Sequence, residues 1–274
     1  MIIDGHAHSS GDFHDVERVI ERLDALGVDK VVMCPGAVND DKNVNFPPVA
    51  RYVTGADVML GVNRVIRTVK RFKPPVESLA ERNELVHRFH ERYPERIVHF
   101  YWADPAADDF LEDLAEKHEA WGFSGIKLHQ CFESFRGDAP GLHEMAAFAA
   151  DRDLPVFIHP YSGDEVSRLM GLMASNVRTT FIIAHLIGME RVAASPRFLN
   201  NVYFEISPWQ LVSECRVLRA IELFGADSVL LGSDTPHGKK SLERNLERVK
   251  GLDIPAGKRD LILGKNMERV LGYS

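Results

Sequence analysis

The sequence predicts an α/β fold, a closed (β/α)8 TIM barrel, as a single domain over residues 1–274. Short apolar runs rich in β-branched residues recur along the chain, and a segment with helical spacing follows each run. Nearly continuous hydrophobicity is typical of parallel strands that are covered on both faces. Eight such runs alternating with helices favour a closed barrel over an open sheet. No GxGxxG motif follows the first run, which also disfavours a dinucleotide-binding sheet.

The strands are expected at eight positions: Met1–Ile3, Lys30–Cys34, Ile97–Trp102, Gly125–Leu128, Pro155–Ile158, Thr179–Ala184, Val202–Ile206 and Val229–Leu231. Apolar residues at helical spacing predict the helices between them. The series from Val16 to Leu26 is one example, and Gly27 is well placed to end it. Further helices are expected from Phe110 and around Met145.

One interval between strands is much longer than the others. Its part from Gly36 to Pro75 contains the stretches NDDKN, FPP and KPP, and we expect it to form a long excursion after the second strand. Loops of this length in a compact domain are usually functional or disordered. On a barrel the excursion would lie at the C-terminal face as an active-site lid. A contact between copies of the chain in a homo-oligomer is the alternative.

Composition restricts the possible partners. The chain carries 33 Lys and Arg against 40 Asp and Glu, a formal net charge of −7, which gives no support to nucleic-acid or membrane binding. No apolar stretch approaches the roughly 20 residues that cross a bilayer. The first residues, MIIDGHAHSS, lack the basic and apolar regions of a signal peptide. Three cysteines without a CxxC pair fit a reducing compartment, so we expect a cytoplasmic protein with a small-molecule substrate.

Polar residues stand at the carboxyl ends of several predicted strands. The first strand runs into His6 and His8, and residues two apart on a strand point the same way. His159, His185 and Asp234 end the fifth, sixth and eighth strands, so all five side chains are expected at one mouth of the barrel. Imidazole nitrogens and a carboxylate suit Zn²⁺, Mn²⁺, Fe²⁺ or Co²⁺. The pattern therefore predicts a site for one or two divalent transition-metal ions, with Zn²⁺ the first expectation.

The motifs along the chain resemble those of a known enzyme group. IIDGHAH, GIKLH, FIHP, IIAHLIG and LLGSDTPHG are similar, in that order, to the motifs of the amidohydrolase superfamily, in particular amidohydrolase family 2. The tail LILGKNMERVLG also resembles the final helix of that branch, which contains hydrolases and non-oxidative decarboxylases. The resemblance implies that His6, His8, His159 and Asp234 are metal ligands. It implies that His185 is a catalytic group or a ligand of a second metal.

Lys127, in the motif GIKLH, has two possible roles. The resemblance suggests a carboxylated lysine that bridges two metal ions, whereas an unmodified ammonium would bind a substrate carboxylate or pair with Asp234. Residues just past the strand ends are candidates to line the substrate pocket: His129, Arg136, Tyr161, Trp209 and His237. Arg64 and Arg67 of the excursion could also hold a carboxylated substrate, and Glu205 could contact the metal ligands from behind.

The predicted function is a metal-dependent hydrolase that cleaves a C–N or C–O bond in a small anionic substrate. Asp234 would take a proton from water and deliver one to the leaving group, while His185 would stabilise the oxyanion. A non-oxidative decarboxylase on the same scaffold is the alternative. DGHAHSS also resembles the start of PHP-type phosphoesterases, which the eight strands and the IIAH and GSD motifs disfavour. A metal- or ligand-binding barrel without turnover is disfavoured because every expected ligand position is filled.

Overall fold

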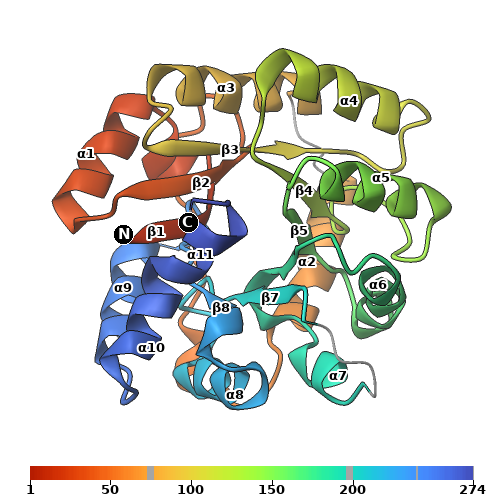
Figure 1. Cartoon of the computed structure of the whole chain (residues 1–274). Coiled ribbons are helices and arrows are strands. Elements are labelled where there is room, and N and C mark those ends of the chain that lie inside the picture. Colours follow the sequence, from red (N-terminus) through yellow and green to blue (C-terminus); the bar gives the residue numbers. More distant parts are fainter. Residues whose placement is uncertain (73–76, 196–199, 239, 274) are drawn as a thin grey trace.

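The computed structural model confirms the (β/α)8 barrel (Figure 1). It describes residues 1–72, 77–195, 200–238 and 240–273. Eight parallel strands pair in sequence order: β1 (Ile3–His8), β2 (Lys30–Cys34), β3 (Ile97–Trp102), β4 (Gly125–His129), β5 (Val156–His159), β6 (Phe181–Ile183), β7 (Val202–Glu205) and β8 (Val229–Leu230). Hydrogen bonds from the segment after β8 close the ring on β1. Asp234 N, for example, donates to His6 O at 2.7 Å.

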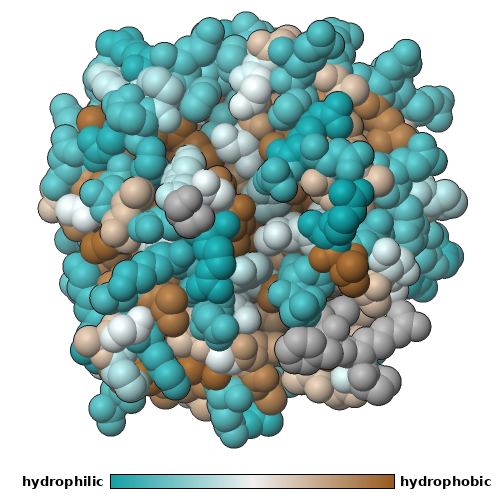
Figure 2. Space-filling model, viewed as in Figure 1, coloured by the Kyte–Doolittle hydropathy of each residue, from teal (hydrophilic) through white to brown (hydrophobic). Residues whose placement is uncertain are grey.

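Helices surround the strands: α1 (Val16–Leu26), α2 (Met59–Phe72), α3 (Leu79–Arg92), α4 (Phe110–Trp121), α5 (Pro140–Ala150), α6 (Gly163–Ser175), α7 (Met189–Ala193), α8 (Glu214–Phe224), α9 (Ser241–Gly251), α10 (Ala256–Asp260) and α11 (Asn266–Val270). Local signals set their ends. Asp15 caps α1 by accepting from two backbone amides, and Gly27 ends it with a left-handed φ of 65°. On the face that carries both termini, hydrophilic residues cover most of the outer helices (Figure 2). Within the described ranges no helix is both long and apolar enough to span a membrane.

Strand residues alternate between two apolar layers. On β3, Val98 and Phe100 belong to a cluster inside the barrel, while Ile97 and Tyr101 belong to the larger cluster between the strands and the helices. Because both faces of each strand are buried in one of these layers, the strand sequences are hydrophobic almost throughout. The polar residues at the strand ends therefore lie just above a packed apolar plug.

An irregularity in β1 aims the two histidines at the barrel axis. Ile3 lies inside the barrel, but the pairing of β1 with β2 shifts register between Asp4 and Ala7. After the shift Ala7 packs in the outer layer, so the even-numbered His6 and His8 face the interior. Such irregularities commonly re-aim side chains next to active sites.

The long excursion after β2 contains a helix that the sequence analysis did not predict. Helix α2 occupies most of its second half, and residues 73–75 of the excursion lie outside the described residues. Asn63 of α2 donates to the carbonyl oxygens of Pro160 at 2.9 Å and Tyr161 at 3.0 Å. These carbonyls follow β5, so α2 lies at the carboxyl ends of the strands, behind the barrel when viewed from the face of the termini (Figure 1). A role as a lid stays a prediction.

His99 on β3 is expected to make the folded state sensitive to acid. Its side chain is fully buried in the outer layer, and neither ring nitrogen has a hydrogen-bond partner among the described residues. Burial lowers the pKa of His99 from 6.5 to about 3. The unfolded chain takes up this proton below pH 6.5, whereas the folded chain does so only near pH 3. Acidification through this window therefore lowers the free energy of unfolding. The loss is roughly 2 to 3 kcal/mol at about pH 4.5.

We expect His99→Phe to reduce this acid sensitivity, because the variant has no proton to take up in the unfolded state. Urea unfolding near neutral pH and near pH 4.5 measures the difference. His143→Gln is a matched control, since His143 is exposed on α5. The prediction would be contradicted if acid lowered the free energy of unfolding as much in His99→Phe as in the parent protein.

Candidate functional site

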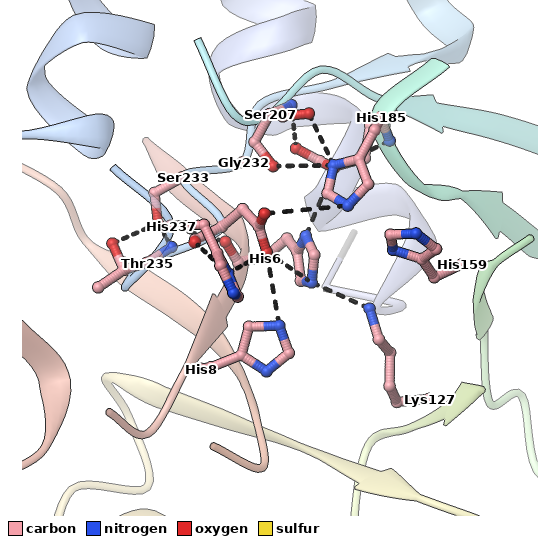
Figure 3. A network of polar contacts seen from close by, with 12 residues as sticks. His6, His8, Lys127, His159, His185, Ser207, Gly232, Ser233, Thr235 and His237 are labelled. Atoms are coloured by element: carbon pink, nitrogen blue, oxygen red, sulfur yellow. Dashed lines mark hydrogen bonds and ion pairs between the residues drawn. The ribbon is translucent and has the colours of Figure 1, made fainter. Parts of the chain in front are cut away.

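Four side chains meet at the mouth of the barrel. The Nε2 atoms of His6 and His8 on β1 lie 3.7 and 3.5 Å from Oδ1 of Asp234, which follows β8. The Nε2 atom of His185, directly after β6, lies 3.9 Å from the other oxygen, Oδ2. Figure 3 shows the imidazoles of His6, His8 and His185 turned towards this common centre. The structure thus brings together four of the five residues expected at the site.

Backbone carbonyls hold two of these rings from behind. Nδ1 of His8 lies 2.8 Å from the carbonyl oxygen of Pro35, and Nδ1 of His185 lies 2.6 Å from that of Ser207. A carbonyl accepts only, so each Nδ1 carries the proton and donates it, and this network assigns the tautomer. Each Nε2 then presents a lone pair to the centre, which is the arrangement of metal-binding histidines.

Glu205, the last residue of β7, lies behind the other side of the cluster. Its fully buried Oε2 is 3.4 Å from Nδ1 of His6 and 3.3 Å from Nδ1 of His185. Burial alone would raise the pKa of Glu205, but the two imidazoles hold it well below its usual range. The backbone N–H of Ser207 adds a hydrogen bond to Oε1. A Cβ at position 232 would lie 2.2 Å from this Oε1, so Gly232 makes room for the carboxylate.

These donors fit a divalent metal ion. The ligand atoms of His6, His8 and Asp234 lie within 4.8 Å of one another. Two of the separations are close to the roughly 3.3 Å edge of a tetrahedron with bonds of about 2.0–2.2 Å. Burial lowers the pKa of His6 to about 3 and also lowers the pKa of His8, so both rings are neutral, as ligation requires. Burial would raise the pKa of Asp234, but nearby histidines, His237 first, keep it far below its usual range.

Lys127 on β4 reaches the same cluster. It is fully buried, and its Nζ lies 2.9 Å from Nε2 of His6 and 4.0 Å from the ring centre of Phe157. Burial lowers the pKa of Lys127. The amine is thus close enough to act on the donor set directly, as either of its two predicted roles requires.

His159 lies beside this cluster in a second group of donors. Its ring stacks on His129 with centroids 3.9 Å apart, and both belong with Cys131 to a set whose ligand atoms lie within 4.8 Å. Its Nε2 contacts Oδ1 of Asn63 at 2.8 Å, and its ring meets His185 edge-on at 4.8 Å. His159 therefore faces the predicted centre while its Nε2 is engaged by α2.

Backbone strain marks the same positions. His185 and Leu186 have φ values of 59° and 55°, and Asp234 has a φ of 54°. The left-handed conformation costs most residues roughly 1–2 kcal/mol, and asparagine and aspartate tolerate it best. Two consecutive strained residues that are not glycine, directly after β6, are typical of a functional site.

A cavity of about 780 Å³ opens above the cluster. Its lining includes the predicted His8, His159, His185 and Asp234. Of the residues expected to bind substrate, His129 and His237 also line it. The other wall comes from the excursion and α2 and is largely apolar: Val38, Phe46, Met59, Val62, Val65 and Ile66.

Two other predicted substrate-binding residues lie elsewhere. Arg136 is exposed and pairs with Asp138 at 2.7 Å, so its charge is neutralised outside the cavity. The ring of Tyr161 lies 4.4 Å below the guanidinium of Arg67, and neither residue is part of the lining. Arg64 of the excursion is exposed and does not line the cavity either.

Trp209 is also outside the cavity. It follows β7 as expected, but its ring lies 5.9 Å from the guanidinium of Arg244 and is not part of the lining. A position just after a strand end therefore does not show whether a residue lines the cavity. Trp209 does not line it, whereas His237 does and lies 3.4 Å from Asp234.

Asn63, Arg82 and Trp102 are among the residues of the cavity region that sequence reasoning missed. Trp102 ends β3 and stacks on His129, so its place at a strand end was a usable signal. Asn63 and Arg82 lie on α2 and α3, and a polar residue on a helix gives no sequence signal of pointing into a barrel mouth.

Comparisons with known proteins agree with this architecture. The family model Amidohydro_2, described as Amidohydrolase, matches residues 3–273. A search of curated proteins finds no match. Among solved structures, an uncharacterized TIM-barrel protein from Bordetella bronchiseptica is 16% identical with a TM-score of 0.70, over 99% of this chain and 98% of that one.

Two enzymes with solved structures have the same fold. A dihydroxybenzoic acid decarboxylase from Polaromonas with bound manganese is 15% identical, with a TM-score of 0.65, and 4-oxalomesaconate hydratase from Rhodopseudomonas palustris is 14% identical, with a TM-score of 0.64. Each alignment covers 99% of this chain and 96% of the other. The match of the family model over nearly the whole length shows that this chain belongs to the amidohydrolase family.

Proposed function

We propose that the protein is a metal-dependent hydrolase that cleaves a C–N or C–O bond, such as an amide, cyclic amide or lactone, in a small anionic molecule. The observation that carries the proposal is the convergence of three Nε2 atoms, from His6, His8 and His185, on the carboxylate of Asp234. A divalent metal bound there, with Zn²⁺ the first expectation, would polarise a carbonyl and lower the pKa of water towards about 7.

The protein's own groups would then handle protons and charge. Asp234 is ionised and reaches the centre of the mouth, so one oxygen can ligate while the other accepts a proton. His185 is positioned to stabilise negative charge on the substrate or to ligate a second ion. Lys127 would bridge two ions if carboxylated, or bind a substrate carboxylate as an ammonium. His159 would complete the ligand set if its Nε2 gave up the contact with Asn63 and bound the metal instead.

We further propose that the excursion acts as a lid. Its residues supply the apolar wall of the cavity, and α2 is tied to the barrel through Asn63. Long segments between two strands often close over a bound substrate.

Non-oxidative decarboxylation is the second candidate. Trp102, His129 and His159 form a stacked series of flat rings along the cavity, which suits an aromatic acid. The Polaromonas protein, by its description, is a decarboxylase of such an acid.

Metal analysis and a substrate panel test the proposal. Protein made without chelator is expected to carry about one or two transition-metal ions per chain, because His6 and His8 are neutral, Asp234 is ionised and these donors converge. Turnover is then screened on amides, cyclic amides, lactones and aromatic acids that carry a carboxylate.

Metal-free protein that takes up neither Zn²⁺ nor Mn²⁺ at micromolar concentration would contradict the metal site. Release of CO₂ in place of hydrolysis would select the second candidate. Full metal content without any turnover would favour a binding barrel.

A further inference from the structure

Arg82, near the start of α3, is a buried cation that nothing in the described structure neutralises directly. The residue is only 7% exposed, and its Nε has no hydrogen-bond partner. Among the described residues its guanidinium makes no hydrogen bond and no ion pair. Its nearest acids are Glu133 and Glu77, which act on it through space. A guanidinium in this state is costly to bury, which usually means that a ligand completes it.

The free guanidinium faces the cavity of the metal donors. Arg82 and Lys70 line the same cavity as His8, His185 and Asp234. The guanidinium carbon of Arg82 lies 5.2 Å from the ring centre of Trp102, and that ring lies 6.0 Å from the ring of His8. Arg82 and His8 therefore lie near the same indole ring.

The local structure holds Arg82 rigidly. The adjacent Asn83 donates to the carbonyl of Trp102 at 2.9 Å and accepts from its N–H at 2.8 Å, which fixes α3 to β3. Glu133 is held away by the indole N–H of Trp102 at 2.8 Å, and burial raises the pKa of Glu133 to about 7. This acid is thus partly neutral near pH 7, so it compensates the charge of Arg82 only in part, and Glu77 acts on Arg82 only through space.

We propose that Arg82 binds a carboxylate of the substrate and so places the reacting bond at the His6, His8 and Asp234 cluster. This inference rests on the proposed function and deepens it. The substrate is a small acid that places its carboxylate at Arg82 and its reacting bond at the donors of the same cavity. The two parallel N–H groups of a guanidinium edge match a carboxylate, and Lys70 adds a second positive charge at the cavity wall.

Binding of sodium benzoate and of neutral benzamide to metal-free protein tests the inference without any catalytic step. Removing the metal matters, because a carboxylate could otherwise bind at the metal itself. We expect the parent protein to prefer benzoate. We expect Arg82→Gln to weaken benzoate binding by about 10- to 100-fold, the usual loss of a charged hydrogen bond, and to leave benzamide unchanged. Titration calorimetry or ligand-observed NMR measures both.

Arg88→Gln is the matched control, since Arg88 lies on the same helix but is exposed and paired with Glu84. This variant is expected to change the affinity for neither benzoate nor benzamide. Thermal unfolding of Arg82→Met separates binding from a structural role: removing an unpaired buried charge should not lower the melting temperature. A clear drop in melting temperature, or a parent protein that binds benzamide as tightly as benzoate, would overturn the inference.

The inference and the proposed function can fail separately. Benzoate binding that depends on Arg82 in a protein with no turnover would overturn the hydrolase proposal and retain the carboxylate site. Turnover of an acid with the same kcat/KM in Arg82→Gln as in the parent would overturn the carboxylate site alone. With an acid substrate we expect Arg82→Gln to raise KM and to change kcat little.

Discussion

Replacing Asp234 with asparagine is expected to lower kcat by at least about 10²-fold, because general-base removal typically costs 10²- to 10⁴-fold. The amide keeps the shape of the side chain but cannot accept a proton at neutral pH. The Asp234 carboxylate lies 3.5 to 3.9 Å from the Nε2 atoms of His6, His8 and His185. The nearby Glu205 lies on the Nδ1 side of His6 and His185, so it does not take the place of Asp234 at the Nε2 atoms. The measurement is kcat on the best substrate of the panel, together with elemental analysis of the variant.

The variant should fold and keep at least part of its metal, since the histidine donors remain. Asp253→Asn removes an exposed aspartate and is expected to leave kcat unchanged. A kcat near the parent value in Asp234→Asn would remove this residue from the mechanism.

Replacing Glu205 with glutamine is expected to weaken metal binding by about 10- to 100-fold, the usual cost of losing a group behind the ligands. Oε2 of Glu205 accepts from the backbone N–H of His185 at 3.3 Å and lies 3.4 Å from Nδ1 of His6. An amide NH₂ at that position would oppose two donors. With the NH₂ turned the other way it would oppose the N–H of Ser207. Neither orientation holds the histidine rings as the carboxylate does.

Competition with a chelator of known affinity measures the change in metal binding. Glu214→Gln is a suitable control because Glu214 is exposed on α8. Circular dichroism shows whether Glu205→Gln is folded. An unchanged metal affinity in the folded variant would mean that Glu205 does not support the ligands.

The strands could be predicted from the sequence because their signal is local. The runs Lys30–Cys34 and Ile97–Trp102 match β2 and β3 at both ends, and the runs predicted for β4 to β8 differ from these strands by one or two residues at an end. The first run was placed wrongly: Met1–Ile3 shares only Ile3 with β1, because the strand continues through polar residues to His8. The pairing of His6 with His8 also follows from a local rule, the two-residue period of a strand. The register shift in β1 that turns both rings inward could not be predicted, because it depends on contacts with neighbouring strands.

The candidate site was predictable where the barrel mouth is built from strand ends, and not where helices supply it. The position of Asp234 after an apolar run was enough to place it at the mouth. Arg82 stands in a charged helical segment that also carries Arg88 and Arg92, and only the packing of α3 shows which of these is buried. Arg136 is the converse case: a loop after a strand offered a plausible cation, and in the structure that cation is exposed and pairs with Asp138.

The division of labour between the barrel and the segment from 36 to 72 affects how this lineage could diversify. The clustered residues His6, His8, His185 and Asp234 stand on or directly after β1, β6 and β8, whereas much of the apolar wall belongs to an insertion between β2 and β3. Substitutions in that insertion can reshape what the cavity accepts without disturbing the donors or the packed strands beneath them. Relatives that share the same histidines and aspartate can therefore differ in the molecules they accept, and substrate preference is expected to follow the sequence of α2 more closely than the sequence of the strands.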